Sequence, residues 1–326
     1  MLAGAVCGAG LLSGGELVAF FGGANVFCLM LSALTFFIGF AFGDFTSGNA
    51  EKYVFLAADA VFSAAMISGL DDILGFAGIL KGVPVASALS IIAFHFLLSK
   101  NVKSIERLNC VLIPVSVAIV LIAVIIAPAA PITGAAGAKG AVNAVLYACM
   151  NVFVALPPVK IAAKNKSKRA KITAALCFSA FFMLFAYLIL RVSPRTSLPL
   201  LDVSYGTPLF PLLIVAIFIG SFTSLVCYLY PLKEFATEKA GNKKTRVFYC
   251  VFLYIALFLL SRVGLNAIIK YLYPVVGALG ASVIIKGFVG IKISAKGDTN
   301  KKRSALCPEK RKTKSKNLPK KNTATI

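Results

Sequence analysis

The residues best suited to chemistry lie in a glycine-rich run near the N-terminus, CGAGLLSGGE, which extends from Cys7 to Glu16. The run carries four glycines and one carboxylic acid inside an apolar segment, residues 2–21, that is about long enough to cross a bilayer. Broken backbone is tolerated at membrane depth only where protein or a water-filled cavity surrounds it. The pattern therefore predicts a broken helix that forms a binding site. The alternative is that the glycines only allow close helix packing.

A break here would leave backbone groups free on both of its sides. The N–H groups that open the outer half-helix, around Ser13, Gly14 and Gly15, carry partial positive charge and suit an anionic group such as a carboxylate. The carbonyls that end the inner half, around Ala5 and Gly8, suit a cation. We therefore expect substrate contacts and ion contacts at the same break.

Glu16 has two interpretations, and both can hold together. Ser13 and Glu16 have the spacing of a capping box, in which Ser13 accepts from the N–H of residue 16 and Glu16 reaches back to the N–H of Ser13. Alternatively, Glu16 is an ionisable group at membrane depth that binds a proton or a cation, because a carboxylate there is costly unless it is paired or hydrated.

Two further stretches carry polar groups inside apolar segments. The run GSFTSL places Ser221, Thr223 and Ser224 halfway along its segment, where their hydroxyls either coordinate a hard cation such as Na⁺ or bond the carbonyls of the preceding turn. Asn151 lies just ahead of the pair Pro157-Pro158, which predicts a second broken helix. Its amide either caps the loosened backbone or contacts the substrate.

The composition is typical of a polytopic membrane protein. The chain is 59% hydrophobic and 14% charged, which a single soluble domain does not match. The eight cysteines are scattered without metal-ligand spacing, and we interpret them as small apolar residues. An enzyme is not expected, because the sequence has one histidine, no P-loop and no recognised nucleophile motif. No cofactor is expected beyond Na⁺ or H⁺ as a coupling ion.

The apolar pattern predicts an all-α protein with about ten transmembrane helices. They are residues 2–21, 25–42, 53–80, 83–99, 108–127, 141–161, 172–192, 209–232, 247–263 and 266–291. Asp59, in the third segment, is expected to face the bundle interior or the cytoplasmic interface, and Asp71 and Asp72 the outer interface. His95, alone on an apolar segment, is expected to be a packed or interfacial residue.

The charge distribution predicts the orientation. With a cytoplasmic N-terminus, twenty-seven Lys and Arg residues fall on the inside, twelve of them in the tail, against five on the outside. Both termini are therefore expected in the cytoplasm. Five segments on either side of a Pro/Gly-rich loop then form an inverted repeat, with residues 1–127 and 141–291 as the halves and 128–140 as the outside loop. Residues 292–326 form a basic disordered tail.

The first segment, GAVCGAGLLSGGELVAFF, resembles the opening helix of the YkvI-like family of bacterial membrane proteins. AAMISGLDDIL in the third segment and YACMNVFVALPPV in the sixth are also similar to that family. The chain departs from the family pattern at Gly15, where the family usually has Gln. The resemblance implies the LeuT-type fold of the amino acid/polyamine/cation transporter superfamily, with five plus five inverted helices and the first and sixth broken. It also points to Thr223 and Ser224 as Na⁺ ligands.

We therefore expect a secondary transporter of a small solute, an amino acid or related compound, that is coupled to Na⁺ or H⁺ and lies in the bacterial cytoplasmic membrane. The alternative is a non-transporting receptor similar to germinant-receptor subunits. Anionic lipids are expected partners of the tail, and nucleic acid is not, because the tail has no aromatic residues. The substrate candidates are Gly8, Ala9, Gly10, Ser13, Gly14, Gly15 and Asn151, and the ion-coupling candidates are Ala5, Gly8, Glu16, Ser221, Thr223 and Ser224.

Overall fold

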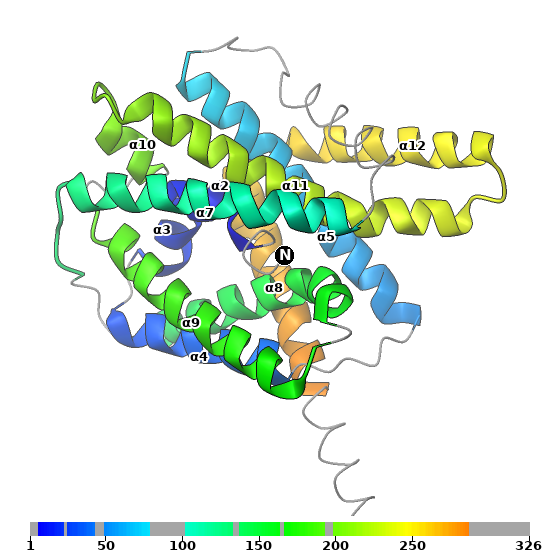
Figure 1. The fold of residues 1–326 in the computed structure, drawn as a ribbon, viewed down its shortest axis with the longest axis horizontal. Helices are drawn as coiled ribbons and strands as arrows, with labels where there is room; N and C mark the ends of the chain where they lie inside the picture. Colours follow the sequence, from blue (N-terminus) through cyan, green and yellow to red (C-terminus); the bar gives the residue numbers. More distant parts are fainter. Residues whose placement is uncertain are drawn as a thin grey trace, which may run out of the picture. The chain divides into compact units, whose positions relative to one another are not determined.

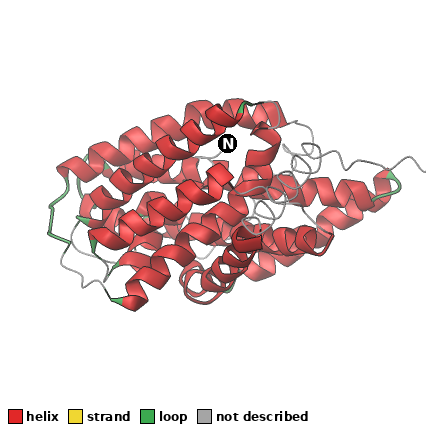
Figure 2. Cartoon of the chain, turned by 90° about the horizontal axis from the view of Figure 1, so that it is seen from below, coloured by secondary structure: helices red, strands yellow, loops and turns green. Residues whose placement is uncertain are grey.

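The computed structural model describes residues 6–22, 25–42, 49–78, 102–132, 137–163, 166–192 and 198–286. These residues form helices and short connections, and none of them belongs to a strand (Figure 2). The predicted segment 83–99 with His95, the tail 292–326 and Ala5 lie outside the described residues. The helices are α2 Ala9–Ser13, α3 Gly15–Phe21, α4 Val26–Phe42, α5 Asn49–Phe76, α7 Val102–Ile126, α8 Ala138–Ala163, α9 Lys168–Leu190, α10 Pro199–Ser204, α11 Phe210–Lys239, α12 Lys243–Ser261, α13 Leu265–Ala267 and the π-helical segment η1 Ile268–Leu272.

Seven of the described helices are long and apolar enough to cross a membrane. They correspond to the third and fifth to tenth predicted segments, and the last of them, Leu265–Lys286, contains α13 and η1. The pair α3 and α4, bent by 110° relative to each other, would make an eighth span if it is counted as one. The all-helical prediction is confirmed for the described residues, whereas ten helices and the inverted repeat stay predictions.

The predicted break in the sixth segment is wrong. Helix α8 continues from Ala138 to Ala163 through both Pro157 and Pro158. Two prolines remove two N–H donors, but neighbouring helices and local backbone adjustments offset such losses in apolar helices. The preceding turns of α8, from residue 151 to residue 156, are buried on all sides, so packing holds the helix together where propensity would end it.

The helices form two groups (Figure 1). In the first group α11 packs along both α5 and α7, and in the second α4 packs along both α8 and α9. The short helices of the first segment connect the groups, because α2 packs against α11 and α5 whereas α3 packs against α8 and α9. The break between α2 and α3 therefore lies where the two groups meet.

Ion pairs join α5 to its neighbours at both of its ends. Lys52 pairs with Glu238 at the end of α11, and Asp71 pairs with Arg262, which follows α12, at 3.4 Å. If the ten predicted segments all cross the membrane, each pair joins helix ends on the same side of it. The positions of Asp71 and Arg262 agree with an interfacial location, because both side chains are partly exposed.

Candidate functional site

The first segment is interrupted at Gly14. Helix α2 ends at Ser13 and α3 begins at Gly15, and Gly14 between them has φ 84° and ψ −5°, a left-handed conformation that favours glycine. A Cβ at Gly14 would also lie 2.8 Å from Cγ2 of Ile189 and 2.8 Å from Cγ of Pro199. Backbone conformation and close packing therefore both require glycine at the break. The predicted interruption of the first segment is present.

A second interruption precedes α2 at Cys7 and Gly8. Both residues are non-helical, and Gly8 is extended with φ −83° and ψ −172°. A Cβ at Gly8 would lie 2.7 Å from Sδ of Met66 and 3.6 Å from Oγ of Ser224, so α5 and α11 approach the backbone here. The structure thus brings together Gly8 and Ser224, two of the residues expected to bind an ion.

Glu16 occupies the first turn of α3 and is 3% exposed. Its Oε2 accepts a hydrogen bond from the Tyr147 hydroxyl on α8, and its Oε1 accepts one from the Tyr273 hydroxyl of the last span, both at 3.4 Å. These distances exceed the usual O–H···O distance of about 2.7 Å, so the tyrosines hold the carboxyl loosely. No described Lys, Arg or His forms an ion pair with Glu16.

Gly10 provides the space for the Glu16 side chain. A Cβ at Gly10 would collide with Cγ, Cδ and Oε1 of Glu16, so the carboxyl arm folds back over α2. The predicted capping box is wrong, because α3 has Gly14 as its N-cap and no side chain caps it. The left-handed turn at Gly14 directs the Glu16 side chain toward Tyr147 and Tyr273. The Ser13 hydroxyl instead accepts a hydrogen bond from the Gly15 N–H and donates one to the Gly10 carbonyl, each at 3.4 Å.

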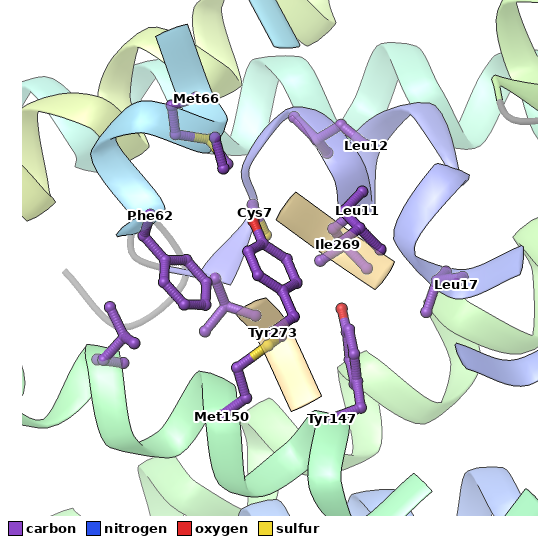
Figure 3. Packing of buried hydrophobic residues seen from close by; sticks show 14 of the residues in the cluster. Cys7, Leu11, Leu12, Leu17, Phe62, Met66, Tyr147, Met150, Ile269 and Tyr273 are labelled. Carbon is purple, nitrogen blue, oxygen red and sulfur yellow. The ribbon is translucent and has the colours of Figure 1, made fainter. Parts of the chain in front are cut away.

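Aromatic packing fixes both tyrosines that face Glu16. The ring centroid of Tyr147 lies 5.2 Å from that of Phe20 and 5.4 Å from that of Phe21. Tyr273 stacks on Phe62 of α5 with 4.6 Å between centroids and 7° between planes. Tyr273 directly follows η1, and the wider π-helical turn changes the direction in which later side chains leave the helix. Figure 3 shows Tyr147 and Tyr273 reaching from separate elements toward Cys7 and Leu11.

The hydroxyls of α11 are buried, but they bond their own helix. Ser221 donates to the Ile217 carbonyl at 2.6 Å, and Thr223 donates to the Gly220 carbonyl at 2.9 Å. This is the local bonding that Ser and Thr commonly adopt in apolar helices. A hydroxyl that donates a hydrogen bond can still accept through its oxygen, so these bonds do not test the predicted ion contact. The position of Ser224 beside Gly8 does not test it either.

The other candidates have structural roles in this conformation. Asn151 is buried and its Nδ2 donates to the Tyr147 carbonyl at 3.0 Å, so it bonds one turn back along α8. The Gly14 N–H donates to the Leu11 carbonyl at 3.1 Å, and the Gly15 N–H is taken by Ser13, so two of the expected substrate donors are already paired. Ala9 belongs to α2, and the side chain of Ala9 is not described.

Sequence reasoning missed the tyrosines around Glu16. Tyr147 and Tyr273 are 131 and 257 residues away from it along the chain. The available signal was the presence of tyrosine within apolar segments, since a buried hydroxyl usually finds a partner. Which direction each ring takes depends on helix rotation, which the sequence pattern did not define.

Among the described residues, no group of three or more His, Cys, Asp or Glu side chains lies close enough to hold a metal ion.

Neither the comparison with models of protein families nor the comparison with curated proteins found a match to this chain. The fold and site therefore define the protein by class only. It is an all-helical protein with several membrane-length apolar helices and a buried glutamate at a break in its first segment.

Proposed function

We propose that this protein is a secondary transporter of a small solute, an amino acid or related compound, in the bacterial cytoplasmic membrane with both termini inside. The resemblance of its first segment to the YkvI-like family supports this proposal. Broken helices at membrane depth are a recurrent feature of transporter binding sites, where free backbone groups contact substrate and ion.

The observation that carries the proposal is the position of Glu16. The carboxyl is buried at the break between α2, which packs on α5 and α11, and α3, which packs on α8 and α9. Among the described residues, it accepts hydrogen bonds from two neutral hydroxyls, that of Tyr147 on α8 and that of Tyr273 in the last span. An ionised carboxylate in such surroundings is costly unless it gains a proton or a cation. Binding of H⁺ or Na⁺ at Glu16 would therefore change how firmly the two helix groups hold together.

The substrate is proposed to bind at the same break. A carboxylate of an amino acid would replace the Ser13 hydroxyl at the Gly15 N–H, which is held at the long distance of 3.4 Å. Movement of one helix group relative to the other would then expose the site to each side in turn. In this mechanism Glu16 carries the coupling ion and the Gly14 turn is the flexible connection.

Binding is tested by thermal unfolding of the purified protein with a panel of amino acids and small amines, at low and neutral pH and with or without Na⁺. A ligand that binds only the folded state raises the free energy of unfolding, by about 2.7 kcal/mol at a concentration 100-fold above Kd, and so raises the melting temperature. We expect one ligand class to do so, with a dependence on Na⁺ or pH. No shift with any ligand would contradict the amino-acid assignment.

Transport is then separated from sensing by flux measurements. With the binding ligand identified, radiolabelled uptake into proteoliposomes should exceed that of protein-free liposomes. Binding without net uptake would instead assign the chain to the receptor class.

A further inference from the structure

A second buried carboxyl, Asp59 on α5, is not used by the mechanism above. It is 1% exposed, and its Oδ2 has no hydrogen-bond partner. Ser63, one turn further along the same helix, is fully buried and its Oγ also lacks a partner. Residues four apart share a face of a helix, so the two oxygens lie on one side of α5.

Asp59 faces α11. Among the described residues, the titratable groups near it include Cys227 and Tyr228, both on α11, the helix that packs along α5. Asn109 of α7 donates its Nδ2 to the Cys227 sulfur at 3.1 Å, and the Asn109 Oδ1 has no partner. No described Lys, Arg or His forms an ion pair with Asp59. Among the described residues, the Asp59 carboxyl thus lies between α5 and α11 without an ion-pair partner.

A buried carboxylate without donor or cation costs several kcal/mol, and a bound proton removes that cost. A proton needs only the carboxyl oxygen itself, whereas a metal ion such as Na⁺ needs several oxygen ligands that converge on one point, and one of the two α11 groups near Asp59 is a thiol. We propose that Asp59 is a proton-binding site and that it holds a proton in the conformation described.

The site is connected with Glu16 through aromatic side chains. Phe62 lies one turn from Asp59 on α5 and stacks on Tyr273, which donates to Glu16. Phe62 also lies 5.3 Å from the Tyr228 ring, and Tyr228 is within electrostatic range of both carboxyls. The two acids are therefore neighbours across one aromatic layer, part of which is seen in Figure 3.

The location of Asp59 along α5 suggests how the proton leaves. Asp59 lies seven positions after Lys52, which corresponds to about 10 Å of helix. Lys52 pairs with Glu238, so separating α5 from α11 at this end would bring water to Asp59. The role of Asp59 as a second proton site for coupling rests on the proposed transport function. The binding of a proton at Asp59 does not depend on that function.

The direct test is infrared difference spectroscopy of the purified full-length protein, which detects the carbonyl band of a protonated carboxylic acid. At neutral pH we expect a band that is lost in Asp59→Asn and retained in Asp72→Asn, a control with an exposed carboxyl on the same helix. Glu16→Gln should leave the Asp59 band. A spectrum of Glu16→Gln without any such band would overturn the proposal even if Asp59→Asn fails to fold.

A second readout is the pH dependence of thermal stability. If the folded protein binds a proton at Asp59 that the unfolded chain releases, stability falls as pH rises above the range in which an exposed Asp ionises. Asp59→Asn should remove part of this loss and melt at least about 3 °C higher than the wild type at pH 8, with a smaller difference at pH 5. Parallel pH profiles for the two proteins would contradict proton binding.

The two proposals fail in different ways. If Asp59→Asn loses the band but still takes up the ligand, Asp59 binds a proton but has no role in coupling. A wild-type protein without uptake but with the Asp59 band contradicts transport and leaves the proton site in place.

Discussion

Glu16 and Asp59 are both buried carboxyls, but their surroundings differ. Glu16 lies at a backbone break between two helix groups and accepts hydrogen bonds from two tyrosines. Asp59 lies inside the continuous helix α5 and has an oxygen without any partner. A group at a break can move with the backbone and exchange partners, whereas a group inside a packed helix changes state only when helices separate. We therefore propose substrate-linked coupling for Glu16 and a slower, conformation-dependent proton exchange for Asp59.

The largest effect is expected from Glu16→Gln, which keeps the shape and removes the charge. Because the proposed coupling ion binds this carboxyl, uptake should fall at least about tenfold, equivalent to about 1.4 kcal/mol. Radiolabelled uptake in proteoliposomes measures it, and Glu234→Gln on α11, an exposed position, is the matched control. Equal uptake in both variants would remove Glu16 from the mechanism.

Gly10→Ala is expected to have the next largest effect. The added methyl collides with the Glu16 side chain, and overpacking of this kind costs about 1 to 3 kcal/mol. Both the melting temperature and uptake should fall. Gly75→Ala on α5 is the control, because nothing lies within 4 Å of its Cβ position and alanine favours the helix by about 1 kcal/mol. A fully active and stable Gly10→Ala would show that the carboxyl arm does not need this position.

Tyr273→Phe and Tyr147→Phe sharpen the contrast, since each removes one of the two hydroxyl donors that distinguish Glu16 from the unpartnered Oδ2 of Asp59. A lost hydrogen bond costs about 1 kcal/mol. Donors stabilise the ionised carboxyl, so their loss favours its protonated form and should shift the pH profile of uptake to higher pH. Tyr205→Phe, 68% exposed, is the control. An unshifted profile in the double variant would exclude control of Glu16 by the tyrosines.

The smallest effect is expected at the Lys52–Glu238 ion pair, which joins the end of α5 nearer to Asp59 to α11. Both side chains are exposed, and exposed pairs contribute about 0 to 1 kcal/mol. A double-mutant cycle with Lys52→Met and Glu238→Gln, followed by thermal unfolding, measures the coupling. A coupling of several kcal/mol would mean that this end of α5 is held much more tightly than proposed.

The sequence pattern predicted the long helices and the first break well, because both depend on local chemistry. Apolar runs defined the seven spans, and the adjacent glycines located the left-handed turn at Gly14. The pattern failed where packing overrides local preference. Pro157 and Pro158 predicted a break, yet α8 continues through them.

The partners of the site residues were less accessible to sequence reasoning. The spacing of Ser13 and Glu16 fits a capping box, but the turn at Gly14 directs Glu16 away from it. Its tyrosine partners depend on the rotation of α8 and of the last span, which periodicity in nearly uniform apolar helices did not define. Asp59 was expected in the interior or at the interface, and the structure places it in the interior.

The most direct test of the central proposal is accumulation of the identified ligand by wild-type protein in proteoliposomes under an imposed H⁺ or Na⁺ gradient. We expect the internal concentration to rise above the external one, and to fall back to equality when an ionophore collapses the gradient. Uptake that only equilibrates, with or without a gradient, would contradict coupled transport through Glu16.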